Sequence, residues 1–339
     1  MARSRRDAAP ADGPPVLPSV VSYIFDGEGG AEPVPLSELG DRREGDNQVA
    51  FARIHLERDN PQADDWLRQS DLDPFVIDAL TADETRPRCT VIGDGAMLNL
   101  RGVNLNPGAE PEDMVSVRLW VEEKRVIGVW RRPLRAVRDM FEAIERNQAP
   151  VSPGDLVAKL ALRLADRAEP TVAALNEQVD GLEEQVLDQS AEIDRGQLAN
   201  VRRMAIMLRR FMVPQRDALT TLEIEDLTWF GDRERSRVRE AAERVTRLGE
   251  DLDAIRDRAQ VIHDQLADRR AEAMNRHMLL LAVVAAVFLP LGLLTGLLGV
   301  NVGGIPGGGN PWAFLIVCAA LVLIGLAQVW FFKRIGLLR

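Results

Sequence analysis

Two long apolar segments near the C-terminal end constrain this chain most. Met278–Val300 is 23 residues long and Trp312–Phe332 is 21, and neither contains a charged residue. As helices, both are long enough to cross the roughly 30 Å hydrocarbon core of a bilayer. A buried helix pair in a soluble protein is the alternative, but neither segment has a polar face to present to water. We therefore predict an integral membrane protein with two transmembrane helices.

Charge is divided sharply at Met278. All 52 Asp and Glu and 39 of the 42 Lys and Arg precede it, so this part carries a net charge of −13 and the remainder +3. An acidic body concentrates cations near its surface and argues against nucleic acid, which needs a basic surface. The two cysteines form no CxxC motif, so a disulfide framework is not expected and a reducing compartment fits the soluble part.

Basic residues flank the apolar pair on its outer sides, and the connecting loop has no charge. They are Arg269, Arg270, Arg276, Lys333, Arg334 and Arg339. The positive-inside rule then places both termini in the cytoplasm. The predicted membrane part comprises a first span at 278–300, an external loop at 301–311, a second span at 312–332 and a cytoplasmic tail at 333–339.

The part before residue 133 alternates short β and α patterns. The first eighteen residues lack the apolar core of a signal peptide and are expected to be a disordered arm. Residues 19–132 are predicted to form an α+β cytoplasmic domain. Its expected strands are Val20–Phe25, Val49–Leu56, Arg88–Ile92, Ala96–Leu100, Val115–Val121 and Arg125–Trp130, and its expected helices are Ala63–Gln69 and Pro74–Leu80. A Gly-Asp-Gly turn at residues 93–95 joins the third and fourth strands as a hairpin.

From Pro133 onward the chain reads as almost continuous helix. Residues 133–231 are predicted to be the helical part of the soluble domain, with helices at Leu134–Asn147, Pro153–Gln189 and Leu198–Leu222. Asp232 is a suitable N-cap, and no proline follows it before Pro290. One helix of roughly 100 Å is therefore expected from Asp232 to about Val300, with residues 232–277 as a stalk. Its heptad pattern favours assembly of several copies.

No catalytic grouping is visible. The chain has three histidines and no Ser/His/Asp grouping, Walker A sequence or HExxH motif. The glycine-rich run Gly303–Gly309 has no lysine after it and lies in the loop between the spans, so we interpret it as a connection, not a phosphate site. We expect neither enzyme activity nor a bound cofactor.

Two spans in one chain cannot enclose an aqueous path. The pair is either a simple anchor or one part of an assembly in which each copy contributes a helix around a central axis. The first span suits the second reading, because Gly292, Gly296 and Gly299 permit close helix packing and Pro290 can bend it. Asn301, at its end, is the strongest ligand nearby.

Several motifs together resemble a known family. Leu289-Pro290-Leu291, Gly296 and Gly299-Val300-Asn301 are similar to the first span of the CorA superfamily of metal-ion transporters, whose signature is Gly-Met-Asn. The Gly-Val-Asn form and Val302–Gly307 resemble the ZntB zinc-transporter branch. So do Arg86–Arg88, Leu100–Gly108 and Arg131–Leu134. The resemblance covers nearly the whole chain from about Val20. Val300 in place of Met puts magnesium in doubt as the main substrate.

The resemblance implies a homopentamer in a bacterial inner membrane, with a cytoplasmic funnel and the first span lining the pore. It places the ion entrance at Gly299, Val300 and Asn301. The matching pore-lining positions are Met278, Leu281, Leu289 and Gly292. It also implies a transported divalent cation, most readily zinc, moved by proton-linked uptake, with efflux as the alternative direction. The alternatives for function are a magnesium or cobalt channel of the same architecture and a membrane-anchored scaffold that transports nothing.

The residues themselves favour passage of a hydrated ion. Five amide oxygens from Asn301 would accept hydrogen bonds from the water shell of a cation without stripping it. Bare Zn²⁺ prefers imidazole, thiolate or carboxylate ligands, and the first span contains none of them. His263 and His277 lie two heptads apart on the stalk and are candidates for a proton or metal relay. Solvated or inter-subunit polar positions are the alternative interpretation of this pair.

Overall fold

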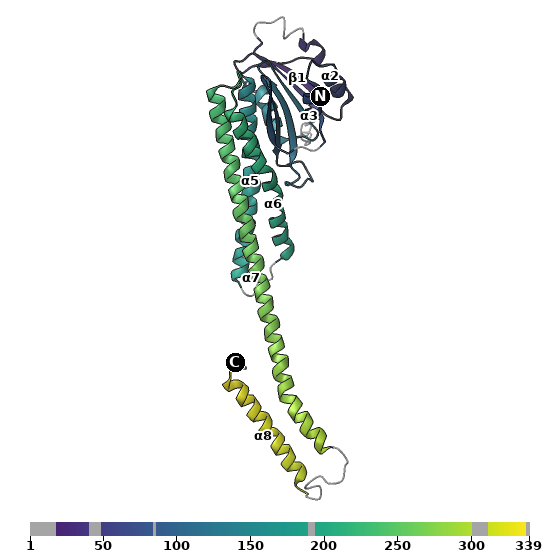
Figure 1. The fold of residues 1–339 in the computed structure, drawn as a ribbon, viewed down its shortest axis with the longest axis vertical. Helices are drawn as coiled ribbons and strands as arrows, with labels where there is room; N and C mark the ends of the chain where they lie inside the picture. The colour runs from purple at the N-terminus through teal and green to yellow at the C-terminus, as the bar shows by residue number, and fades with distance from the viewer. Residues whose placement is uncertain (1–17, 41–48, 84–85, 189–193, 300–310, 337–339) are drawn as a thin grey trace, which may run out of the picture. The chain divides into compact units, whose positions relative to one another are not determined.

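The computed structural model describes residues 18–40, 49–83, 86–188, 194–299 and 311–336. The chain divides into two compact units, Met1–Val261 and Ile262–Arg339. The first unit contains the predicted α+β domain, built as a sheet with helices on both faces, and the second contains two apolar helical segments (Figure 1).

The described strands form one seven-stranded sheet with the order β2-β1-β3-β7-β6-β5-β4. Neighbouring strands are antiparallel except β3 and β7, which pair in parallel with Ile54 opposite Ile127. The bounds are β1 Val20–Phe25, β2 Ala31–Pro33, β3 Phe51–Glu57, β4 Arg88–Ile92, β5 Gly95–Gly102, β6 Val115–Glu122 and β7 Arg125–Trp130. The predicted hairpin joins β4 to β5 and turns at Gly93, whose φ of +58° suits glycine.

One face of the sheet is covered by two short helices. α2 spans Pro61–Gln69 and α3 spans Pro74–Thr81, and each begins with a side-chain cap. Asn60 accepts a hydrogen bond from the Gln62 amide, and Asp73 accepts one from the Phe75 amide. Such caps satisfy amide groups that the first helical turn leaves without partners. Apolar side chains of both helices then complete a core over β3, β5, β6 and β7.

The opposite face is covered by α4, Arg135–Glu145, and α5, Pro153–Leu187, while α6, Arg195–Ile224, packs against β4 and β5. Close packing against β5 is favoured by a glycine at position 102, because a Cβ there would lie 2.7 Å from Leu134 Cδ1 and 2.8 Å from a methyl carbon of Leu164. A 3₁₀ turn at Leu36–Glu38 completes the described elements before α7.

The helix α7 runs from Asp232 to Leu298 without interruption, 67 residues with Pro290 inside it. The predicted continuous helix is therefore present over the described residues. Its heptad positions are buried within the single chain: Val245, Leu252, Ile255 and Ala259 are at most 1% exposed. Since α5, α6 and α7 lie side by side in Figure 1, this seam is filled mainly by the chain's own helices. The heptad pattern thus carries less information about assembly than the sequence suggested.

Candidate functional site

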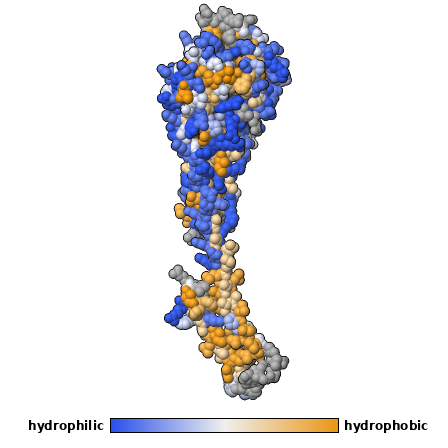
Figure 2. Space-filling model, viewed as in Figure 1, coloured by the Kyte–Doolittle hydropathy of each residue, from blue (hydrophilic) through white to orange (hydrophobic). Residues whose placement is uncertain are grey.

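The second unit presents an unusually large apolar surface. Two helices are long and apolar enough to cross a membrane, the C-terminal part of α7 and α8, Ala313–Arg334. Hydrophobic residues cover both in Figure 2. Leu281, Leu289 and Phe314 are 66%, 72% and 80% exposed. A soluble protein rarely exposes a contiguous apolar surface of this kind, so these helices are suited to lipid or to other membrane helices.

The contact between α7 and α8 uses one side of each helix. On α7, Val283 is buried and Val287 and Leu291 are half-buried, at intervals of four residues. On α8 the half-buried side chains also recur at three and four residue intervals and comprise Val317, Leu321, Ile324 and Gln328. At the crossing, a Cβ on Gly325 would lie 3.9 Å from Leu291 Cδ1. The small residue allows the two helices to approach.

The predicted pore-lining residues lie on the other side of α7. Met278, Leu281, Leu289 and Gly292 fall within an arc of about 80° around the helix, and Gly299 falls within the same arc. The centre of this arc is about 160° from the side that contacts α8. Met278 is 54% exposed, and nothing lies within 4 Å of a Cβ built on Gly292. The structure therefore leaves this apolar stripe of α7 uncovered.

Polar groups at the C-terminal end of α7 are largely satisfied by the helix itself. The Thr295 hydroxyl donates to the carbonyls of Leu291 and Gly292, at 3.0 and 3.1 Å. The Gly299 amide donates to the Thr295 carbonyl at 2.9 Å. Val300 and Asn301 lie outside the described residues. The hydroxyl of Thr295 is thus engaged with the backbone, as is usual for threonine inside a helix.

The two stalk histidines are exposed. His263 falls within the arc of the apolar stripe, and His277 lies about 40° outside it, because an α-helix drifts by about 20° per heptad. They are far apart along the helix and do not form a shared site within one chain. Among the described residues no group of three or more His, Cys, Asp or Glu side chains is placed to hold a metal ion.

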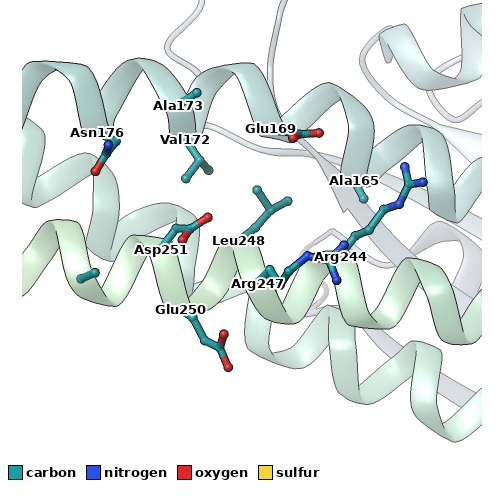
Figure 3. A pocket seen from close by; sticks show the side chains of 11 residues that line it. Ala165, Glu169, Val172, Ala173, Asn176, Arg244, Arg247, Leu248, Glu250 and Asp251 are labelled. Carbon is teal, nitrogen blue, oxygen red and sulfur yellow. The ribbon is translucent and has the colours of Figure 1, made fainter.

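A cavity of about 740 Å³ opens between α5 and α7 in the first unit (Figure 3). Its apolar lining includes Val172 and Leu248, and its charged lining includes Glu169, Arg247 and Asp251. Both acidic and basic side chains line the opening. This mixture selects neither for a cation nor for an anion.

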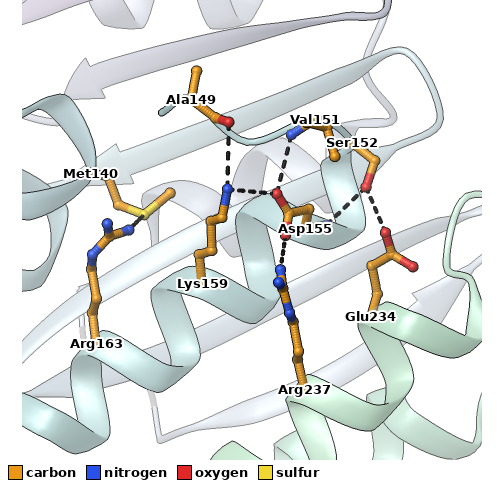
Figure 4. Close-up of polar contacts among 9 residues, drawn as sticks. All are labelled: Met140, Ala149, Val151, Ser152, Asp155, Lys159, Arg163, Glu234 and Arg237. Atoms are coloured by element: carbon orange, nitrogen blue, oxygen red, sulfur yellow. Dashed lines mark hydrogen bonds and ion pairs between the residues drawn. The ribbon is translucent and has the colours of Figure 1, made fainter. Parts of the chain in front are cut away.

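Ion pairs hold α5 to α7 on both sides of this cavity. At the start of α5, the buried Asp155 accepts hydrogen bonds from the Val151 amide at 3.1 Å and from Arg237 of α7, and pairs with Lys159 at 2.8 Å (Figure 4). Near the end of α5, Arg258 of α7 donates to both oxygens of Glu183, at 2.8 and 2.6 Å. This hydrogen-bonded pairing lowers the pKa of Glu183.

Four charged or titratable side chains are buried in the sheet, which the sequence pattern did not predict: Arg125 of β7, 8% exposed, and three that are buried more deeply. Arg53 and His55 of β3 and Arg118 of β6 are 2%, 1% and 2% exposed. Burial lowers the pKa of both Arg53 and Arg118 to about 10, with like charges adding to the effect. Strand alternation is the sequence signal that could have revealed their burial, because the three deeply buried side chains occupy inward-facing positions between apolar neighbours.

Comparison with known proteins gives a consistent result. Residues 50–334 match the family described as "CorA-like Mg2+ transporter protein". The chain is 38% identical to the divalent cation transporter CmaX of Pseudomonas aeruginosa over 327 residues, which are 93% of this chain and 96% of that protein. It is 36% identical to the zinc transport protein ZntB of Pectobacterium carotovorum over 317 residues, which are 93% of this chain and 95% of that one.

Solved structures agree with these sequence matches. The full-length CmaX structure superposes with a TM-score of 0.81 at 37% identity, over 95% of this chain and 99% of that chain. The CorA magnesium transporter from Methanocaldococcus jannaschii has a TM-score of 0.80, over 95% of this chain and 100% of that one. Its identity to this chain is 15%, so that likeness concerns the fold alone.

Proposed function

Because the chain belongs to the CorA-like Mg²⁺ transporter family and is a transporter of divalent cations, we propose that its main cargo is zinc. Two observations support zinc over magnesium. Relatives named as zinc transport proteins are 33–36% identical to it over almost its whole length. The end of its first span also reads Gly299-Val300-Asn301, which departs from the Gly-Met-Asn signature that it resembles.

The uncovered apolar stripe of α7 is the observation that carries the proposed pathway. α8 packs on the opposite side of α7 and leaves Met278, Leu281, Leu289 and Gly292 free. A face of this kind must meet lipid, another protein surface or the lumen of a pore. We assign it to the pore, and α8 to the outer side facing lipid.

Several copies are required to close such a pore, and we propose a homopentamer in a bacterial inner membrane with both termini in the cytoplasm. Two helices per chain cannot surround an aqueous path. Gly292 and Gly296 have no neighbouring atoms within 4 Å of a built Cβ. They therefore leave room either for a close helix from another copy or for a wider lumen beside the leucines.

The chemistry of the stripe favours an ion that keeps most of its water. The first span contains no Asp, Glu, His or Cys, so no first-choice zinc ligand is available along the proposed pathway. Stripping a divalent cation beside leucine side chains would be costly. In the proposed mechanism, Asn301 holds the hydrated ion at the outer entrance, with Gly299 and Val300. Leu281 and Leu289 form apolar constrictions that control wetting.

We further propose that transport is linked to protons at the stalk and not inside the membrane. Neither span carries a carboxylate or an imidazole that could relay a proton. His277 directly precedes the first span, and His263 lies on the same side of α7 as the apolar stripe. Protonation of His277 in five copies would add positive charge at the inner mouth and oppose a passing cation.

Flux through the reconstituted full-length protein tests this proposal. Sealed proteoliposomes containing a zinc, magnesium or cobalt indicator are compared under set pH gradients, with empty liposomes as the control. We expect the highest initial rate for zinc and a rate that rises with the inward proton gradient. Faster magnesium flux would assign the protein to the second candidate, a magnesium or cobalt channel, which the family description favours.

A further inference from the structure

The last turn of α8 leaves the adjoining side of α7 uncovered. α8 runs back along α7 in Figure 1, and where they cross a Cβ built on Gly325 would lie 3.9 Å from Leu291 Cδ1. At about 1.5 Å per residue in both helices, Lys333 is then level with about Val283. α8 ends one residue later, at Arg334, so it does not extend beside the part of α7 that precedes Val283.

On that uncovered side, α7 presents an apolar side chain and then a cationic one. Leu280 and Arg276 lie within about 20° of the centre of the side that contacts α8, and about 5 Å and 10 Å beyond Val283 along the helix axis. Both side chains are exposed. A molecule that lies against the end of α8 therefore meets the leucine first and the arginine about one helical turn farther on.

Positive charge dominates around the end of α8. Lys333 and Arg334 are basic residues of its last turn and are exposed, and together with Arg276 we call them the basic cluster. No ion pair joins any of the three to a carboxylate among the described residues. The nearest carboxylate along α7 is that of Glu272, and from residue 273 to the C-terminus the chain has four Lys or Arg and no Asp or Glu. The cluster therefore keeps a net positive charge.

Trp330 indicates the depth of the basic cluster in the bilayer. The Arg334 guanidinium lies over its ring, with 5.2 Å between Cζ and the ring centroid, and the tryptophan is 61% exposed. Exposed tryptophans of membrane helices are enriched at the level of the lipid headgroups. Arg276 lies about 10 Å farther out than Lys333, which is close to the thickness of the headgroup layer of one leaflet, about 5–8 Å. The cluster thus spans this layer.

Orientation of the spans does not account for the position of Arg276. Basic residues near a span help to keep that end in the cytoplasm wherever they lie around the helix. Arg276 lies on the side of α7 where a lipid beside α8 would meet it, whereas the exposed Arg270 lies about 120° away around the helix. The guanidinium of Arg334 also keeps its N–H donors, because the Trp330 ring occupies only one of its faces.

We propose that the basic cluster binds the phosphate headgroup of an anionic phospholipid of the cytoplasmic leaflet, with Leu280 against the apolar part of the lipid. Guanidinium groups match phosphate oxygens in a bidentate manner, and basic clusters next to a membrane span attract anionic lipids. A zwitterionic lipid carries its own cation, which the cluster repels. The assignment rests on the proposed topology, in which both termini are cytoplasmic and α8 faces lipid.

Quenching of tryptophan fluorescence by brominated phospholipids tests the proposal. The full-length protein is reconstituted in phosphatidylcholine bilayers that contain an equal minor fraction of either brominated phosphatidylglycerol or brominated phosphatidylcholine. We expect stronger quenching by the phosphatidylglycerol, and we expect Trp330→Phe to remove most of this preference while Trp312→Phe, at the other end of α8, retains it. The readout is lipid contact, so it succeeds or fails independently of zinc flux, which tests the proposed function.

Arg276→Gln is the informative variant, because Arg276 is exposed and forms no ion pair among the described residues. We expect it to reduce the preference for phosphatidylglycerol by about fivefold. Arg270→Gln, which removes an exposed arginine of α7 outside the cluster, is the matched control and is expected to leave the preference unchanged. Inorganic phosphate should reduce the preference no more than chloride does at the same ionic strength.

Four outcomes would overturn the proposal. The first is equal quenching by the two brominated lipids, and the second is a preference that survives in Trp330→Phe. The third is equal behaviour of Arg276→Gln and Arg270→Gln, which would show diffuse attraction between the membrane and all nearby basic residues. The fourth is displacement of the lipid by inorganic phosphate beyond the chloride control, which would assign the cluster to free phosphate.

Discussion

His55 makes the first unit sensitive to mild acid. The side chain is 1% exposed, stacks on Trp130 with 5.6 Å between ring centroids, and meets the edge of Phe141 at 5.3 Å. Neither ring nitrogen has a hydrogen-bond partner among the described residues. Burial lowers the pKa of His55 well below its usual value of 6.5, and the charge of Arg53 on the same strand lowers it further. The folded protein therefore holds this imidazole neutral.

The size of the effect follows from proton linkage. In the unfolded chain His55 binds a proton below about pH 6.5, whereas in the folded chain it does not until the pH falls through its lowered pKa. The free energy of unfolding thus falls by about 1.4 kcal/mol for each pH unit below 6.5. At about pH 5 the loss reaches about 2 kcal/mol, as long as the folded state stays neutral. For a unit of this size, that lowers the Tm by about 4–8 °C.

Replacing His55 by Leu removes the titrating group and keeps an apolar side chain in its place. Thermal unfolding of the full-length wild type and variant is followed by tryptophan fluorescence in detergent at about pH 7.5 and about pH 5. Lost stacking on Trp130 lowers the Tm of the variant equally at both pH values and cancels in the comparison. We expect the wild type to lose about 4–8 °C more than the variant on acidification. His263→Leu, which removes an exposed histidine, is the control. We expect its Tm to fall on acidification by as much as that of the wild type. Equal acid sensitivity in wild type and His55→Leu would refute the reasoning.

Three further predictions concern transport in proteoliposomes. Asn301→Ala is expected to abolish or severely reduce zinc flux while the assembly remains intact by native mass measurement, because we propose that its amide holds the ion; unchanged flux would rule out the proposed selectivity ring. Leu281→Ser should raise the passive zinc leak by wetting a constriction. Leu280→Ser, a similarly exposed position about 100° from Leu281 and about 140° from the centre of the apolar stripe around α7, should not; equal leaks would place the pore elsewhere. His277→Ala is expected to flatten the pH dependence of flux, and an unchanged profile after replacing both His277 and His263 would exclude a histidine relay.

Elements with a strong local pattern could be predicted from the sequence. The hairpin of β4 and β5 was visible in its Gly-Asp-Gly turn, and the unbroken α7 followed from the absence of proline between Asp232 and Pro290. Both elements are determined by residues close together in the sequence, so the residues that cause the structure are the same ones that reveal it. The lengths of the two spans and their lack of charged residues were likewise visible in continuous stretches of sequence.

Long-range pairing could not be predicted in the same way. The parallel contact of β3 with β7 joins segments about seventy residues apart, and nothing in either strand specifies its partner. β2 was missed because it has three residues and no apolar alternation. The heptad seam was a third case: the pattern correctly indicated a buried helix face, but a period of 3.5 residues does not say whether the partner is another copy or the chain's own α5 and α6.

The candidate ion pathway also depends on a partner that the local sequence does not specify, because one face of α7 is left uncovered. α8 packs against one face of α7 at Val283, Val287 and Leu291. Among the residues that the structure describes, no further membrane helix covers the face with Leu281 and Leu289. If both faces of α7 were meant for lipid, there would be no reason for glycines on the uncovered one, because glycine destabilises a helix relative to alanine. Gly292 and Gly296 lie on that face with nothing near them. Their cost is offset only if another surface or a lumen uses the space, and this argues that the functional unit is an assembly of chains.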